Sequence, residues 1–293
     1  MLTKVSLPRP RPLGRGRGRN FWGWLVLPGG ALLVFFFVWP LGEMVAQSFT
    51  NPNVGFGNYS RFFSSHADIS AIFTTFEVSA LVTLICAVIG YCYAYTMVSA
   101  SPRVRSILMV AVMFPAGVSL LVRIFAIEVL IQDVGPVNEA LKRIGLIKQP
   151  LPLIGSDIGT SIGMVSILLP YMVLPMYAVM RRIDREYLLA ASSLGANPVR
   201  ALLRVYFPMS LPGVLTGSLI VFVSGIGYYI VPSILGSGSQ LFMGQLVNLY
   251  FNEGEWGYGS AIAVVLLGLM LVVLVIASRF TKLSDAFGSV AGE

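Results

Sequence analysis

The chain has 293 residues, of which 56% are hydrophobic and 11% are charged, and its mean hydropathy is +0.81. Soluble domains carry roughly 25% charged residues, so this composition excludes an ordinary soluble protein and places most of the chain in lipid. The formal net charge of +7 does not point to nucleic acid, because the basic residues flank apolar runs.

The first 20 residues contain six basic residues and no acid. The run Arg15–Arg19 could bind RNA, but a basic tail held in the cytoplasm is the favoured interpretation. The apolar run Phe21–Gly42 follows. It exceeds the roughly 7–15 residues of a signal-peptide core, so we interpret it as a retained membrane anchor.

Five further apolar runs predict membrane helices, at 71–97, 106–132, 158–180, 211–235 and 258–278. Exported segments are expected at 43–70, which holds the lone His66, and at 236–257, and a short amphipathic helix is expected at 138–144. Cys86 and Cys92 lie inside an apolar run and predict neither a disulfide nor a metal site. The expected fold is an all-α polytopic membrane protein, with a transmembrane domain at 21–280 between cytoplasmic tails at 1–20 and 281–293.

Most of the 20 Lys and Arg residues fall in the N-terminal tail, the turn at 101–105, the segment 181–212 and the C-terminal end. Basic residues accumulate on the cytoplasmic side of membrane proteins. These segments and both termini are therefore predicted to be cytoplasmic.

The longest charged segment between two apolar runs is 184–212, and it predicts two short helices joined by a glycine. The first helix is expected at 185–194, and Gly195 suits the left-handed position that ends it. Asn197 and Pro198 are typical of an N-cap and a first helical position, so a second helix is expected through Val205. Pro208 and Pro212 are expected to end it.

This segment resembles the "EAA" loop of bacterial ABC importer permeases, whose pattern is two alanines, a glycine, an aliphatic residue, an apolar residue and a proline at fixed spacing. The matching residues are Ala190, Ala191, Gly195, Val205, Phe207 and Pro208. The family has Glu before the alanines where this chain has Leu189, and Glu186, one turn earlier, offers a carboxylate instead. A helix-capping role for Asp184 and Glu186 is the alternative.

The resemblance implies that the segment docks on an ATPase subunit, with these residues in contact: Asp184, Arg185, Glu186, Leu189, Ala190, Ala191, Gly195, Pro198, Arg200 and Pro208. It also implies two ATPase subunits, a second homologous permease or a homodimer, and an exported solute-binding protein. The chain has no glycine-rich phosphate-binding loop, so ATP and Mg are expected on the ATPase subunits and no cofactor or catalytic site on this chain. The bacterial plasma (inner) membrane is the expected location.

Nearly the whole chain is similar to the spermidine/putrescine-type subgroup, notably at 119–147, 167–177, 235–247 and 256–267. That resemblance implies import of polyamines or a related small organic amine. Aminophosphonates, opines or other small solutes remain alternatives. A secondary transporter or a membrane-embedded enzyme would need an ion-coupling residue or a catalytic constellation, and the sequence indicates neither.

Three ionisable residues fall on or next to the third predicted span: Arg123, Glu128 and Asp133. Charge is costly inside a membrane, so these residues mark either a water-filled interior or contacts between helices. Five-residue steps separate neighbours by roughly 140°, so the three cannot share one narrow stripe. In the path hypothesis, the two acids favour a cationic amine and the rings of Phe222, Tyr228 and Tyr229 assist, whereas Arg123 opposes it.

Overall fold

The computed structural model describes residues 28–238 and 241–290, and these ranges contain helices and no strand. The chain divides into two units, residues 1–46 and 47–293, and each is described by itself. Five helices in the described ranges are long and apolar enough to cross a membrane, or six if one bent pair is a single span. The predicted all-α membrane fold is confirmed.

The first membrane-length helix is Pro28–Thr50, which includes a π-helical turn at Val34–Val38 and α2 (Trp39–Thr50). Its apolar side chains from Leu32 to Trp39 are all exposed, as expected of a helix that faces lipid. The expected end at Gly42 was wrong. The helix continues to Thr50 because Asn51 precedes a proline and therefore disfavours helical dihedrals. The basic tail at 1–20 lies outside the described residues.

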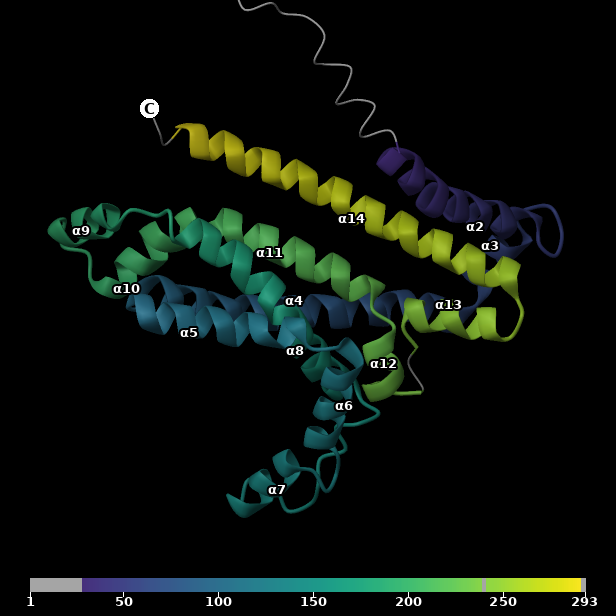
Figure 1. Cartoon of the computed structure of the whole chain (residues 1–293), viewed down its shortest axis with the longest axis horizontal. Coiled ribbons are helices and arrows are strands. Elements are labelled where there is room, and N and C mark those ends of the chain that lie inside the picture. The colour runs from purple at the N-terminus through teal and green to yellow at the C-terminus, as the bar shows by residue number, and fades with distance from the viewer. Residues whose placement is uncertain (1–27, 239–240, 291–293) are drawn as a thin grey trace, which may run out of the picture. The chain divides into compact units, whose positions relative to one another are not determined.

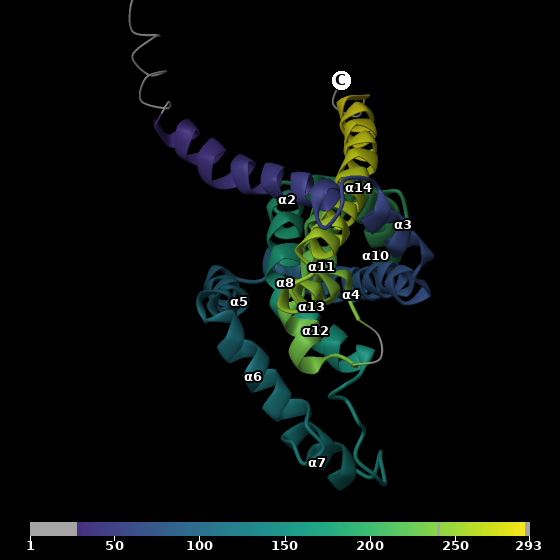
Figure 2. The same ribbon diagram turned by 90° about the vertical axis from the view of Figure 1, so that its right-hand side faces the viewer.

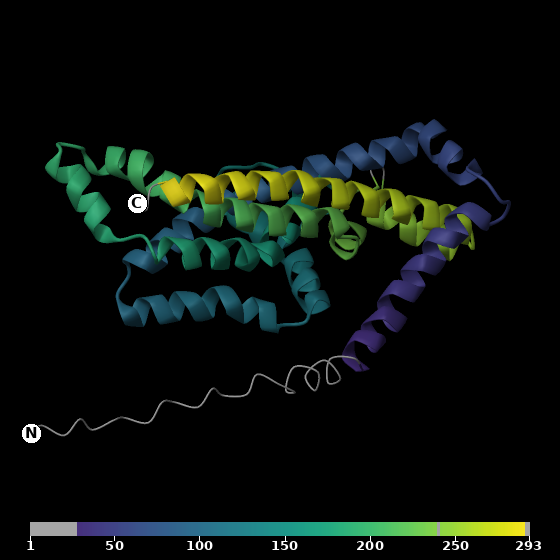
Figure 3. The ribbon, with the colours of Figure 1, turned by 90° about the horizontal axis from the view of Figure 1, so that it is seen from above.

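The core of the second unit is formed by α4 (His66–Ser99), α8 (Asp157–Met180) and α11 (Phe207–Gly227), which pack side by side (Figure 1). Val82, Met172 and Val221 are fully buried between them. A Cβ added to Gly217 would lie 2.8 Å from the Met172 sulfur, so the missing side chain is what lets α11 approach α8. The last helix, α14 (Trp256–Val290), runs along α11 (Figure 3).

The third predicted span is not one straight helix. α5 (Pro102–Met113) leads through a 3₁₀ turn (Phe114–Gly117) to α6 (Leu120–Ile131), and the chain bends by 103° at this break. Pro115 lacks an N–H and Gly117 favours non-helical dihedrals, so a continuous ladder is interrupted here. Figure 2 shows α6 and α7 (Pro136–Arg143) continuing along the new direction. The short helix expected at 138–144 is confirmed as α7.

The fifth predicted span starts earlier and ends earlier than expected. One helix, Pro198–Gly227, runs from α10 (Pro198–Ala201) through a π-helical turn (Leu202–Tyr206) into α11, so Pro208 and Pro212 do not break it. In the wide turn, Phe207 N–H donates to Leu202 C=O, which changes the hydrogen-bond register just before Pro208. Tyr228 is extended, and α12 (Ile230–Leu235) is a separate short helix.

Two segments expected as exported loops contain helices. The segment 43–70 holds α3 (Gly57–Ser64) and the first turn of α4, and 236–257 holds α13 (Met243–Asn252). Both helices are short and carry polar residues, so hydropathy alone did not reveal them. The fourth predicted span, 158–180, matches α8, and the last matches the first two thirds of α14, whose helix continues to Val290 through most of the expected tail.

Candidate functional site

The segment that carries the EAA-like pattern forms two helices, α9 (Arg185–Ser193) and α10, with local geometry that follows the sequence signals. We call 184–208 the coupling arm. The Asp184 carboxylate accepts the Glu186 N–H at 3.3 Å, and the Asn197 side chain accepts the Arg200 N–H at 2.8 Å, so both helices have N-caps. Pro198 is the first residue of α10, as predicted.

Gly195 ends α9 in the left-handed conformation, with φ of +84°. Its N–H donates to Ser192 C=O at 3.0 Å, and the next N–H, of Ala196, donates to Ala191 C=O at 3.0 Å. This pattern satisfies two carbonyls at the helix end and turns the chain sharply. No atom lies within 4 Å of a Cβ added to Gly195, so the position is open to solvent and to a partner.

The coupling arm carries several exposed apolar side chains. Leu189 is 65% exposed, and Leu194 is 88% exposed. Val199 and Leu203, in the second helix, are exposed as well. Among the residues predicted to dock, Ala190, Arg200 and Pro208 are also exposed and Ala191 is half-buried, whereas the Arg185 side chain is not among those that the structure describes. Exposed apolar side chains gathered on one short segment are typical of an interaction site.

The inner side of the arm is held against α4. The ring of Tyr206 packs edge-on against Tyr95 with centroids 5.4 Å apart, and Tyr206 is buried. Between the arm and the end of α4 lies a cavity of about 540 Å³, lined mostly by apolar residues that include Leu188 and Val98. The arm therefore touches the bundle at its base and leaves its far end free.

The three charged residues of the third predicted span form no ion pair with one another. Arg123 and Glu128 are half-buried on α6, while Asp133 is exposed in the turn that follows. The Arg123 Nε and Nη1 atoms are buried and have no hydrogen-bond partner among the described residues. Its positive charge acts on the Tyr228 hydroxyl, so these two predicted path residues do lie near one another.

Two other predicted path residues lie elsewhere. The Phe222 ring packs against Phe76 of α4 with centroids 5.9 Å apart, beside an apolar groove formed by α4, α11 and α14. Tyr229 is 41% exposed, at the start of α12. Phe222 and Tyr228 are therefore not placed in one pocket, although both belong to the same predicted span.

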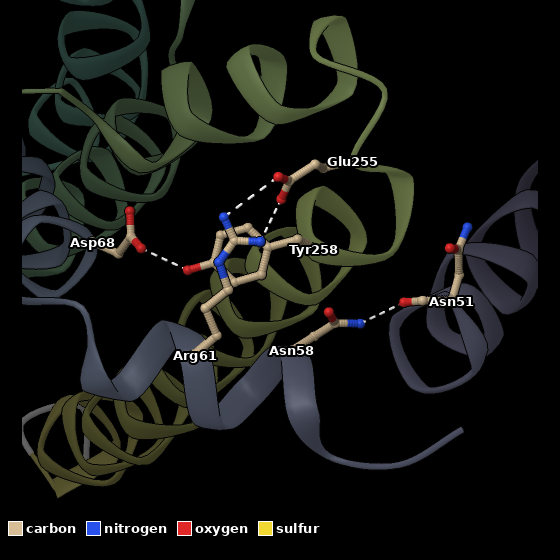
Figure 4. Close-up of polar contacts among 6 residues, drawn as sticks. All are labelled: Asn51, Asn58, Arg61, Asp68, Glu255 and Tyr258. Carbon is tan, nitrogen blue, oxygen red and sulfur yellow. Dashed lines mark hydrogen bonds and ion pairs between the residues drawn. The ribbon is translucent and has the colours of Figure 1, made fainter. Parts of the chain in front are cut away.

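A polar cluster that the sequence did not reveal joins α3, α4 and α14 (Figure 4). We call Arg61, Asp68, Glu255 and Tyr258 the brace. The Tyr258 hydroxyl donates to the buried Asp68 carboxylate at 2.6 Å. Arg61 pairs with Glu255 at 2.5 Å and stacks over the Tyr258 ring, with its guanidinium carbon 4.0 Å from the centroid. The hydrogen bond that Arg61 donates to the Glu255 carboxylate raises the pKa of Arg61, which therefore stays charged.

The brace combines one strong contact with one weak contact. Arg61 and Glu255 are 51% and 41% exposed, so their pairing contributes about 0–1 kcal/mol. The Asp68 contact is buried, and its loss would leave a carboxylate without its partner. Nearby, the Met243 N–H of α13 donates to the buried Thr75 hydroxyl of α4 at 2.9 Å. No sequence spacing links residues 190 positions apart, which is why this cluster was missed.

Residues 87–286 match the family described as "Binding-protein-dependent transport system inner membrane component". The spermidine/putrescine transport system permease protein PotB of Haemophilus influenzae is 30% identical over 261 residues, which cover 86% of this chain and 91% of that protein. PotB of Escherichia coli is 31% identical over 207 residues, or 69% and 75% of the two chains. The putative 2-aminoethylphosphonate transport system permease protein PhnU of Salmonella typhi is 27% identical over 87% of this chain and 91% of its own length.

Solved structures of similar fold are also transporters. A chain of a bacterial alginate ABC transporter, in complex with an alginate-bound periplasmic protein, aligns with a TM-score of 0.77 at 15% identity, over 90% of this chain and 95% of that one. A chain of the MetNI methionine ABC transporter aligns with a TM-score of 0.55, over 74% and 95%. Identities this low show the fold alone.

The family match and the PotB relatives confirm the resemblance predicted from the EAA-like pattern and from the similar segments along the chain. The chain belongs to the binding-protein-dependent transport system inner membrane components and is a permease subunit of an ABC importer.

Proposed function

We propose that this permease imports polyamines such as spermidine and putrescine, or a related small organic amine. The observation that carries the proposal is the 30% identity to a spermidine/putrescine permease over 86% of the chain. Because the similarity extends over nearly all the spans, it includes the helices that would surround a solute.

The coupling arm is the proposed docking site for an ATPase subunit. Its support is the exposed apolar surface at Leu189, Leu194 and Val199, together with the open left-handed Gly195. We further propose that two ATPase subunits hold ATP and Mg, that a second homologous permease completes the pore and that an exported binding protein delivers the solute. In this arrangement the arm, the tails at 1–20 and 281–293 and both termini are cytoplasmic.

Glu128 is the proposed path residue for a cationic amine, because it is a half-buried acid on a helix that the bend at 114–119 turns away from α5. Asp133, exposed at the end of α6, would attract the same cation at the mouth of the path. Both carboxylates lower the cost of moving positive charge through a medium of low dielectric constant.

Aminophosphonate import is a second candidate, favoured by Arg123. Two buried donors of its guanidinium have no partner among the described residues, and an unpaired buried donor is costly. A phosphonate accepts hydrogen bonds from both arms of a guanidinium, and PhnU, a relative at 27% identity, is named for such a solute. An aminophosphonate also carries the amine that Glu128 would attract.

Uptake into proteoliposomes that contain the complete importer separates the two candidates. We expect ATP-dependent and binding-protein-dependent uptake of radiolabelled spermidine, lowered at least severalfold by Glu128→Gln. Arg123→Gln should leave spermidine uptake near the normal rate. Uptake of 2-aminoethylphosphonate without spermidine uptake, and its loss in Arg123→Gln, would establish the second candidate instead. If an importer that hydrolyses ATP normally takes up neither solute, both candidate functions are contradicted.

A further inference from the structure

A cavity of about 550 Å³ lies where α4 ends, α5 begins and α8 ends, and three arginines line it. We call it the arginine pocket, and its charged residues are Arg105, Arg181, Arg182 and Asp184. Arg181 and Arg182 directly follow Met180, the last residue of α8. Arg105 is in the first turn of α5, which starts three residues after the end of α4 at Ser99.

The positive charge of the pocket is largely uncompensated. Asp184 is the one acid that lines it among the described residues, against three arginines. Neither Arg181 nor Arg182 has an ion pair with the described part of the chain. Both side chains are exposed, so they can reorient toward a ligand.

Arg105 is fixed by the backbone of α4. Its Nε donates to Met97 C=O at 3.0 Å, and its Nη2 donates to Val98 C=O at 3.3 Å and to Ala100 C=O at 3.2 Å. These bonds cap the carbonyls at the C-terminus of α4 and leave Nη1 directed at no described acceptor. One wall of the pocket is therefore rigid, and the other wall carries the two exposed arginines.

The position of the pocket at the ends of candidate membrane spans points to the class of its ligand. All three arginines lie within a few residues of the ends of candidate membrane spans, His66–Ser99 and Asp157–Met180. The Arg181 guanidinium carbon is 5.9 Å from the centroid of the Tyr177 ring, and tyrosine is enriched at membrane–water interfaces. Lipid phosphates occupy this depth, and guanidinium groups bind phosphate oxygens in pairs.

We propose that the arginine pocket binds the phosphate of an anionic phospholipid. The ligand chemistry is a phosphate ester with net negative charge, and we take the membrane as its source because the pocket lies at the ends of candidate membrane spans. Arg105 supplies a fixed donor, and Arg181 and Arg182 close on the phosphate from the α8 side. Binding there would tie the base of the coupling arm to the lipid surface. This inference requires membrane insertion but does not depend on the transported solute.

Native mass spectrometry of the complete importer, purified in mild detergent and titrated with phosphatidylglycerol, tests the proposal. Replacing both exposed arginines, by Arg181→Gln with Arg182→Gln, is expected to weaken phosphatidylglycerol binding roughly 30-fold. Arg103→Gln is the matched control, because Arg103 is an exposed arginine of α5 that does not line the pocket, and it should bind normally. The pair Arg181→Lys with Arg182→Lys keeps the charge but loses the paired guanidinium hydrogen bonds, so its binding should fall between that of the original protein and that of the glutamine pair.

Three outcomes would overturn the proposal. The first is equal retention of phosphatidylglycerol and zwitterionic phosphatidylcholine. The second is displacement of the lipid by millimolar inorganic phosphate, which would assign the pocket to a soluble anion. The third is loss of ATPase co-purification in the glutamine pair with unchanged lipid binding, which would assign the arginines to a protein contact.

Discussion

The coupling arm and the brace form opposite ends of the helical unit at 47–293, and they are built differently (Figure 1). The arm leaves Leu194 and Val199 exposed and contacts the bundle mainly at its base through Tyr206. The brace turns its polar groups toward one another, and Asp68 is buried with its partner Tyr258. The coupling arm therefore leaves apolar side chains exposed, whereas the polar groups of the brace bind one another.

A glycine with positive φ ends a helix in both regions, so local backbone geometry does not explain why one region is exposed and the other is packed. Gly195 ends α9 at φ of +84°, and Gly254 ends α13 at φ of +81°. In each case the glycine N–H bonds a carbonyl three residues back, at 3.0 Å to Ser192 and 3.2 Å to Phe251. What differs is the next contact: Glu255 pairs with Arg61, whereas Asn197 and Pro198, which follow Gly195, are exposed. The left-handed glycine after α13 leads into a contact within the unit, whereas the one after α9 leads into exposed residues.

The largest expected effect comes from placing a side chain on the turn of the arm. Gly195→Asp meets no atom within 4 Å, so its cost to folding is the strain of a left-handed residue, about 1 kcal/mol. The carboxylate would project from the surface that we propose docks on the ATPase. We expect a normal amount of protein in the membrane and a loss of more than tenfold in ATP-driven solute uptake.

Gly145→Asp is the matched control for this variant. Gly145 ends α7 at φ of +74° with an open Cβ position, and its N–H bonds Lys142 C=O at 3.1 Å, so its local geometry repeats that of Gly195. It lies outside the arm, and its aspartate variant should transport normally. Normal uptake by Gly195→Asp, or an equal loss of uptake in both variants, would contradict a specific role of the Gly195 turn in docking.

The next effect tests the brace. Tyr258→Phe removes the hydroxyl that satisfies the buried Asp68 carboxylate, and an unsatisfied buried group costs roughly 1–3 kcal/mol. Tyr250→Phe is the control, because its ring packs 4.7 Å from that of Tyr258 but its hydroxyl makes no hydrogen bond with the described residues. Thermal unfolding of the purified protein should show a lower midpoint for Tyr258→Phe alone. Equal unfolding midpoints for the two variants would mean that the hydrogen bond between Tyr258 and Asp68 does not stabilise the fold.

The coupling arm was predictable because its signals are local. Asn197 and Pro198 start a helix and Gly195 ends one whatever surrounds them, and the structure places each as expected. The proline argument failed at Pro208, since the π-helical turn before it supplied a backbone arrangement that the pattern does not encode. The opposite error occurred at Pro115: the third predicted span was expected to be continuous, but the chain bends by 103° there.

The brace could not be predicted because its contacts are distant in sequence. Arg61 and Glu255 are 194 residues apart, and each taken alone is an ordinary polar residue beside a span. The third-span charges show the same limit. Periodicity predicts that Arg123, Glu128 and Asp133 do not share one narrow stripe, but it cannot indicate that Arg123 lies near Tyr228.

The smallest expected effect concerns the charge of the arm. Glu186 and Leu189 are three residues apart on α9, hence neighbours on its surface, and both are exposed. If the Glu186 carboxylate pairs with the ATPase in place of the family glutamate, Glu186→Gln should lower ATPase co-purification about fivefold at low salt. The difference should vanish near 1 M salt, where the Debye length is about 3 Å.

Helix capping is the competing explanation, and Glu139→Gln controls for it. Glu139 is also an exposed acid in the first turn of a short helix, α7, so its loss removes a similar interaction with the helix dipole. Capping alone predicts a small loss of stability in both variants and unchanged ATPase retention. A pairing role predicts that Glu186→Gln releases the ATPase while Glu139→Gln does not. If both variants retain the ATPase equally at every salt concentration, Glu186 does not pair with it, and the apolar residues around Leu189 would make the contact alone.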